Sequence, residues 1–97
     1  MFARLTRFEA NKDKIDEVIN IYKNSVIPSA KLEKGRKKSY LLIDRNSGKG
    51  IGISMWETEV DAIANEQSGE RQEQLSKFKD LFTAPPVREG YEVSVQG

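Results

Sequence analysis

Cysteine and histidine are both absent from the 97 residues of this chain. Without cysteine there is no disulfide and no thiolate to act as a nucleophile or a metal ligand. Without histidine the chain lacks the usual acid–base group at neutral pH and the commonest metal ligand. These absences exclude haem ligation by histidine, cysteine–histidine zinc sites and a Ser-His-Asp triad. We therefore expect no metal centre.

The chain also lacks an excess of charge of one sign and long apolar runs. Sixteen Lys and Arg residues offset fifteen Asp and Glu residues, so the net charge is +1. That balance gives no general attraction to nucleic acid or to anionic membranes. No apolar run approaches the ~20 residues of a membrane span, and the opening MFARLTRFEA has no signal-peptide core. We expect a cytoplasmic protein that binds neither nucleic acid nor membrane.

Hydrophobic periodicity predicts four strands and two helical regions. The strands are expected at 2–9, 39–44, 50–57 and 90–96. The first helix is expected within 11–35, where apolar residues recur at helical spacing. Pro28 should end or bend this helix near Val26, because proline lacks an N–H and crowds the preceding turn.

The second helical region is expected in two pieces. Thr58 resembles the start of a capping box, and the first piece should run to about Glu66. Gly69 should interrupt the helix, and Ser68 can cap the stretch that follows. The sequence APP at 84–86 should terminate that stretch.

The predicted order is β-α-β-β-α-β in a single domain spanning 1–97. Right-handed crossovers and a hairpin between the middle strands favour a ferredoxin-like sandwich. In that fold, both helical regions cover one face of a four-stranded antiparallel sheet.

Alternation along the strands divides their side chains between the two faces of the sheet. The aliphatic residues of the third strand are expected to face the helices, with Trp56 pointing away from them. The predicted helix side holds Ala3, Leu5, Leu41, Ile43, Ile51, Ile53, Met55, Tyr91, Val93 and Val95. The predicted opposite face holds Phe2, Arg4, Thr6, Phe8, Tyr40, Leu42, Gly52, Ser54, Trp56, Glu92, Ser94 and Gln96.

That opposite face would leave a large apolar patch in water if the protein were a monomer. Its polar residues would in turn be costly in a dry interior. Two such sheets facing each other would enclose a partly wet cavity, which is what a small-molecule site requires. We therefore expect a homodimer.

Three segments resemble a known family: SVIPSAKLEKG after the first helix, YLLIDRNSGKGIGISMWETEVDAIANEQSG through the hairpin, and APPVREGYEVSV near the end. They are similar to small proteins of the antibiotic-biosynthesis-monooxygenase type, within the dimeric α/β-barrel superfamily. The resemblance covers nearly the whole chain. It implies a homodimer with a ligand cavity in each subunit, either between sheet and helices or at the barrel interior.

The resemblance also implies an activity. Characterised monooxygenases of this type oxidise aromatic polycyclic substrates with dioxygen and use neither metal nor flavin, so no cofactor is expected. Trp56 matches the Trp that ends the third strand in such proteins, whereas Arg4 and Tyr40 are candidates by face alone. The haem-degrading branch uses a helical His. Here the corresponding stretch AIANEQSG carries Asn65 and Glu66 instead, which argues against haem degradation.

Each candidate also has a structural explanation. Trp56 could pack in a dimer core or line a ligand site. Arg4 lies on a strand next to that of Glu92, so an ion pair between them is favoured over substrate binding. The remaining ligand-binding candidates are Tyr40, Thr6, Ser54 and Asn65. Their structural alternatives are a buried hydroxyl, bound water and a fraying helix end.

The basic run within 31–38 is predicted to be a solvated loop, because it has almost no aromatic stacking platform for nucleic acid. Two functional classes then remain. One is a cofactor-independent monooxygenase acting on an aromatic or quinone-like compound. The other is a non-catalytic small-molecule-binding or assembly module of the same fold.

Overall fold

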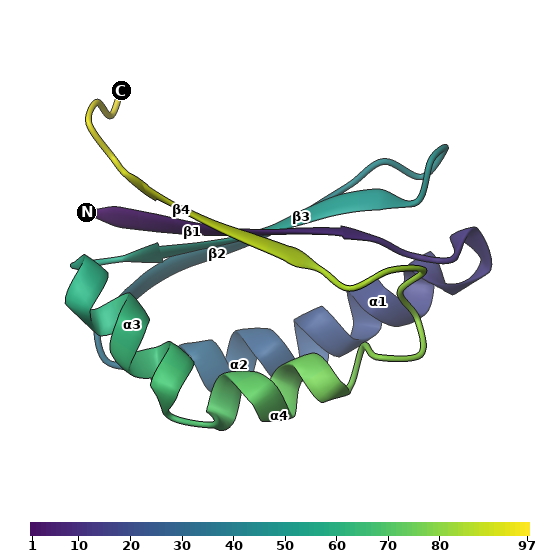
Figure 1. The fold of residues 1–97 in the computed structure, drawn as a ribbon, viewed down its shortest axis with the longest axis horizontal. Helices are drawn as coiled ribbons and strands as arrows, with labels where there is room; N and C mark the ends of the chain where they lie inside the picture. Colours follow the sequence, from purple (N-terminus) through teal and green to yellow (C-terminus); the bar gives the residue numbers. More distant parts are fainter.

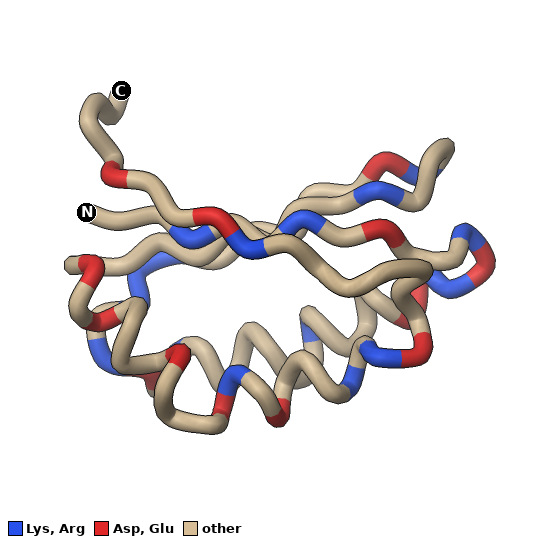
Figure 2. Tube along the Cα trace, viewed as in Figure 1, with Lys and Arg blue, Asp and Glu red and all other residues tan.

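The computed structural model describes residues 1–97 and has the predicted ferredoxin-like fold. A four-stranded antiparallel sheet in the order β2-β3-β1-β4 has all of its helices on one face (Figure 1). The strands are β1 (Phe2–Glu9), β2 (Arg36–Ile43), β3 (Lys49–Trp56) and β4 (Val87–Glu92). Charges of both signs are interspersed along the whole chain (Figure 2), in keeping with the balanced composition.

The first helical region runs from a 3-10 turn at Lys12–Lys14 through α1 (Ile15–Ile21) to α2 (Ile27–Ala30). It does not end near Val26. Between α1 and α2 the chain instead forms a π-helical turn, Tyr22–Val26, in which the N–H of Ile27 donates to the carbonyl of Tyr22. Because a proline ring crowds the turn before it, a wider turn ahead of Pro28 lets the helix continue.

The second helical region is divided as predicted into α3 (Glu59–Gln67) and α4 (Glu70–Ser76). The hydroxyl of Thr58 accepts the N–H of Asp61 at 3.2 Å, which caps the start of α3. Gly69 separates the helices with a φ of +82°, a conformation that L side chains rarely adopt. The helix α4 ends at Ser76, well before the prolines expected to terminate it. None of the helices is long and apolar enough to cross a membrane.

The last strand lies earlier in the sequence than predicted, at Val87–Glu92 rather than 90–96. It pairs with β1, and Glu92 stands opposite Phe2, the first residue of that strand. The N–H of Val93 still donates to the carbonyl of Met1, but the residues that follow Val93 lie beyond the end of β1. The alternating residues beyond this point therefore have no strand of the same chain to pair with.

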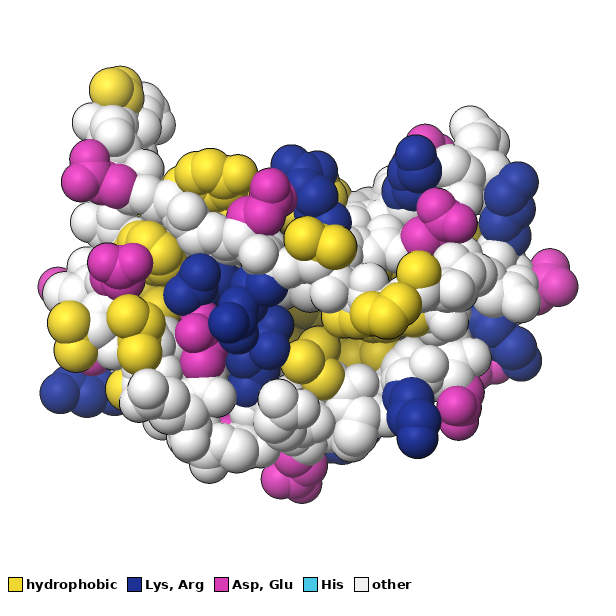
Figure 3. Space-filling view, in the orientation of Figure 1, with side chains coloured by type: hydrophobic (Ala, Val, Ile, Leu, Met, Phe, Trp, Pro, Cys, Tyr) yellow, Lys and Arg dark blue, Asp and Glu magenta, His cyan; other side chains and the backbone are white.

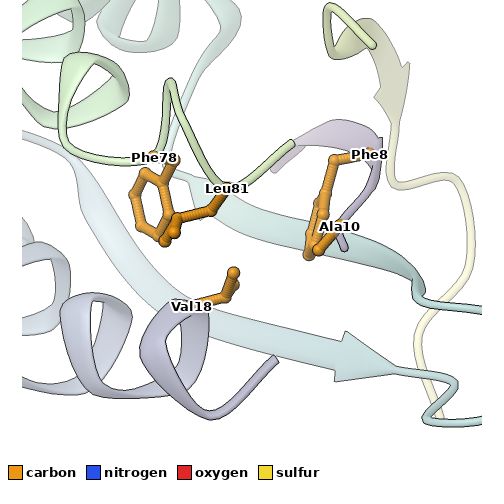
Figure 4. Packing of buried hydrophobic residues seen from close by; sticks show 5 residues of the cluster. All are labelled: Phe8, Ala10, Val18, Phe78 and Leu81. Carbon is orange, nitrogen blue, oxygen red and sulfur yellow. The ribbon is translucent and has the colours of Figure 1, made fainter. Parts of the chain in front are cut away.

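The predicted assignment of the two sheet faces is wrong for β1, β3 and β4. Trp56 is only 2% exposed and packs on the helix side, with Phe2 and with Ala62 of α3. Phe8 also faces the helices, within a cluster completed by Ala10, Val18, Phe78 and Leu81 (Figure 4). Only β2 is as predicted, since Leu41 and Ile43 pack against that cluster.

Glycines on the helix-facing side of the sheet make room there for large side chains of β1. A side chain at Gly50 would overlap the ring of Phe8. A side chain at Gly90 would overlap the guanidinium of Arg4 and the ring of Phe2. The large side chains of β1 therefore occupy the space left by the glycines of neighbouring strands.

The face of the sheet away from the helices carries the aliphatic residues of β1 and β3 instead. We call it the open face. Its apolar members are Ala3, Leu5, Tyr40, Leu42, Ile51, Ile53, Met55, Val87 and Tyr91, which the cross-strand register places on one side. Among them Tyr40, Leu42, Val87 and Tyr91 are each about half exposed or more.

Candidate functional site

A cavity of about 130 Å³ lies between the sheet and the helices of the same chain. The side chains of Arg4, Thr6 and Phe8, successive helix-facing residues of β1, line it from its polar to its apolar end. At the apolar end the ring of Phe82 stacks on those of Phe8 and Phe78, at centroid distances of 4.9 and 5.7 Å. Apolar walls with a few polar groups at one end are typical of a small-molecule pocket.

Trp56 lies at the polar end of the cavity, as the last residue of β3. Its indole N–H donates to the hydroxyl of Ser54 at 3.0 Å. The guanidinium of Arg36, the cross-strand neighbour of Trp56, lies 4.7 Å from the indole centroid. This cation–π contact and the hydrogen bond fix the orientation of the ring.

Arg36 is also paired with Glu33, at 3.4 Å between Nη2 and Oε2. The two side chains are only 11% and 10% exposed. Burial raises the pKa of the Glu33 carboxyl and lowers the pKa of the Arg36 guanidinium, and each partly offsets this effect in the other. The prediction of a solvated loop over 31–38 is wrong for its last three residues, because β2 begins at Arg36 and not at residue 39. The other basic residues of 31–38 are exposed as expected, but Arg36 is not.

Arg4 pairs with Glu66 of α3 and not, as predicted, with Glu92. The distance from Arg4 Nη2 to Glu66 Oε1 is 2.5 Å, and both side chains are largely buried. Glu92 stands at the exposed end of β4 opposite Phe2, whereas α3 lies over the sheet at Arg4. The other carboxyl oxygen of Glu66 lies 3.5 Å from Nη2 of Arg88.

Tyr22, rather than Tyr40, is the tyrosine of the cavity. Tyr22 belongs to the π-helical turn, and its hydroxyl donates to the backbone carbonyl of Tyr40 at 3.2 Å. Burial raises the pKa of the Tyr22 hydroxyl, with Arg36 acting in the opposite direction. Tyr40 itself is 46% exposed on the open face.

The structure brings five of the six predicted ligand-binding residues together and leaves out Tyr40. The five that line the cavity are Arg4, Thr6, Ser54, Trp56 and Asn65. Four of them lie on the sheet under the helices of their own chain and Asn65 lies on α3, so the expected pocket between two sheets is not where they meet. The resemblance had allowed for a cavity between sheet and helices.

Sequence reasoning missed more than half of the polar lining. The missed residues are Tyr22, Glu33, Arg36, Glu66, Arg71 and Gln74. For Arg36 the simple signal misleads, because counting back from the hairpin places Lys37 opposite Trp56, and only a register shift between Arg36 and Lys38 brings Arg36 there. For Glu66 and Arg71 there was none, since they reach the cavity only through the packing of α3 and α4 on the sheet.

The arrangement can hold a flat apolar ring between aromatic side chains and present cations to an oxygen atom at the polar end. A guanidinium in such a partly buried place stabilises negative charge more strongly than it would in water. No group of three or more acidic side chains converges where it could hold a metal ion.

Solved structures of other proteins share this fold. A monooxygenase of Streptomyces coelicolor, solved in complex with nanaomycin D, superposes with a TM-score of 0.80 over 99% of this chain and 91% of its own, at 13% identity. A protein of unknown function from Nitrosomonas europaea gives 0.80 over 99% and 91%, at 20% identity. An antibiotic biosynthesis monooxygenase gives 0.79 over 98% and 100%, at 11% identity.

The predicted likeness to antibiotic-biosynthesis-monooxygenase proteins is thereby confirmed for the fold. No protein-family profile matches the sequence, and no curated protein sequence matches it. At these sequence identities the comparison supports the shared fold and not a shared activity.

Proposed function

We propose that this chain binds a small planar organic molecule in the cavity beside Trp56 and oxidises it with dioxygen, as a monooxygenase without a cofactor. The observation that supports this proposal is the cavity itself, with stacked aromatic rings at one end and Trp56 and arginines at the other. The S. coelicolor monooxygenase with the same fold was solved with an organic ligand, nanaomycin D.

The proposed reaction converts a phenol into a quinone. One oxygen atom of dioxygen becomes the second quinone oxygen, and the other leaves as water with the two hydrogens that the phenol loses. The reactive form is the phenolate, because it gives up electrons to dioxygen more readily than the neutral phenol. Arg4 or Arg36 at the polar end would stabilise the phenolate oxygen.

A non-catalytic binding protein of the same fold is the second candidate. It is favoured by the state of the cavity's carboxylates, because Glu33 and Glu66 are each held by an arginine. Neither is free to act as a general base toward a phenol.

We also propose that the chain forms a homodimer through its open face. The supporting observation is the set of aliphatic and aromatic residues on that face, which are the large apolar side chains that the helices leave uncovered. A second copy of the same sheet matches this surface in extent and in apolar character. Such an interface should bury upward of about 2,000 Å² in total.

The test of function begins with a thermal-shift screen of phenols and quinols, because a ligand that binds only the folded protein raises its melting temperature. Compounds that bind are then followed with an oxygen electrode. Oxygen uptake with quinone formation supports the monooxygenase, whereas saturable binding without product supports the binding module.

Trp56→Phe and Tyr40→Phe form a matched pair of variants for this screen. Trp56→Phe should weaken binding, because Trp56 lines the cavity, while Tyr40→Phe should leave it unchanged. If no planar compound shifts the melting temperature, or if both variants bind like the parent, the cavity is not the binding site.

A further inference from the structure

Arginine is in excess over its carboxylate partners at one side of the cavity. Arg4 and Arg88 share the single carboxylate of Glu66. Arg71, in the first turn of α4, also lines the cavity and has no carboxylate within ion-pair distance. Three guanidiniums therefore gather around one carboxylate.

The surface shows the same concentration of charge. In Figure 3, Lys and Arg side chains cluster near the middle of one face, beside a hollow lined by hydrophobic side chains. Burial lowers the pKa of Arg71, and the neighbouring Arg88 and Arg4 lower it further, as expected where positive charges are crowded. An anion placed here would offset this repulsion.

Two atoms of the cluster lack a hydrogen-bonding partner. Nε of Arg4 is buried and donates to no acceptor. Oε1 of Glu66 lies close to Arg4 Nη2 but not at the angle of a hydrogen bond. Buried donors without acceptors are costly, so Arg4 retains capacity for one more acceptor.

The size of the cavity limits what can accompany the anion. Its volume of about 130 Å³ is close to that of an engineered apolar cavity of about 150 Å³ that binds benzene. A single aromatic ring therefore matches the space beside Phe8, Phe78 and Phe82.

We propose that the ligand of this cavity is a monocyclic aromatic carboxylate, with its ring among the phenylalanines and its carboxylate at Arg71 and Arg4. This proposal rests on the proposed function, because it places the ligand in the same cavity. A carboxylate fits better than a phosphate, because it is planar with the ring and matches the flat fork of a guanidinium.

The test compares benzoate with benzamide, a neutral molecule of nearly the same shape. Trp56 is the only tryptophan, so its fluorescence reports binding in the cavity without a label. Benzoate should bind about tenfold or more tightly than benzamide, as expected for a hydrogen-bonded charge. Its affinity should fall as sodium chloride is added.

Arg71→Gln should bring the ratio of the two affinities close to one. Arg71→Lys should restore part of the preference for benzoate over benzamide. Lys79→Gln is the matched control, because it removes the same charge from an exposed residue outside the cavity. It should leave the ratio unchanged.

The possible failures are distinct. If benzamide binds as tightly as benzoate, the anion site is wrong while the cavity remains a binding site. An unchanged ratio in Arg71→Gln would also overturn the anion site. If neither compound binds, and the wider screen of planar compounds also fails, the proposed function falls with it.

Discussion

The indole N–H of Trp56 donates a 3.0 Å hydrogen bond to the hydroxyl of Ser54, two residues earlier on the same strand. Both side chains face the helices, because residues two apart on a strand share a face. The bond satisfies a polar group that is otherwise buried, since Trp56 is almost fully enclosed. Ser54 is thus a structural partner of Trp56 as well as part of the cavity wall.

Ser54→Ala should lower the free energy of unfolding by about 1–3 kcal/mol, because it leaves the buried indole N–H without an acceptor. Urea denaturation followed by circular dichroism measures the effect. Ser94→Ala is the control, because Ser94 lies in the exposed tail and bonds only to Glu92. Equal stabilities of the parent and Ser54→Ala would mean that water replaces the hydroxyl.

Gly50 and Gly52 face the same side of β3 and should respond differently to alanine. A side chain at Gly52 meets nothing closer than 4.0 Å, from Tyr22, whereas one at Gly50 overlaps Phe8. Gly52→Ala should leave stability unchanged or raise it by up to about 1 kcal/mol. Gly50→Ala should lower it by about 1–3 kcal/mol through overpacking. Thermal unfolding of both variants measures these changes in stability. A larger loss of stability for Gly52→Ala than for Gly50→Ala would contradict the open space beside Gly52.

Glu33 should titrate above its ordinary pKa of 4.5, because burial disfavours its charged form. Its folded state holds the proton more tightly than the unfolded chain does. The contribution of Glu33 to the free energy of unfolding therefore decreases as pH rises from about the unfolded value of 4.5 through the raised folded pKa.

Carboxyl-carbon NMR measures this titration residue by residue. Glu57 serves as the internal comparison, because its hydrogen bond with Lys37 lowers its pKa. Glu33 should therefore titrate at a higher pH than Glu57. Coincident titration curves would show that Glu33 is not buried as described.

Leu42→Glu should convert the proposed dimer into a monomer, because it places a charge on the open face, where Leu42 is about half exposed. Analytical ultracentrifugation should give about twice 11.0 kDa for the parent and 11.0 kDa for the variant. Val60→Glu, on the exposed side of α3, should stay dimeric. A parent chain that sediments as a monomer at micromolar concentration would refute the dimer.

The order of the elements could be predicted from the sequence by itself, because local signals set it. The cap at Thr58, the break at Gly69 and the alternation of the strands act over a few residues. The ferredoxin-like topology follows from that order through the rules for chain connections. Five of the cavity residues were also found, because alternation correctly groups Arg4, Thr6, Ser54 and Trp56 on one face, although that face was expected to point away from the helices; the fifth, Asn65, lies on α3.

Only the tertiary structure decided which face of the sheet the helices cover. Alternation defines two sets of side chains but not their destination. The larger aliphatic set was expected to face the helices, because burying apolar side chains stabilises the fold. Here Gly50, Gly52 and Gly90 leave room on the helix side for Phe2, Phe8 and Trp56, and for a cavity. The pairing of Arg4 with Glu66 and the position of Arg71 at the cavity were likewise decided by packing, because α3 and α4 lie against the sheet only when the chain has folded. No local signal encodes contacts between residues so far apart in sequence.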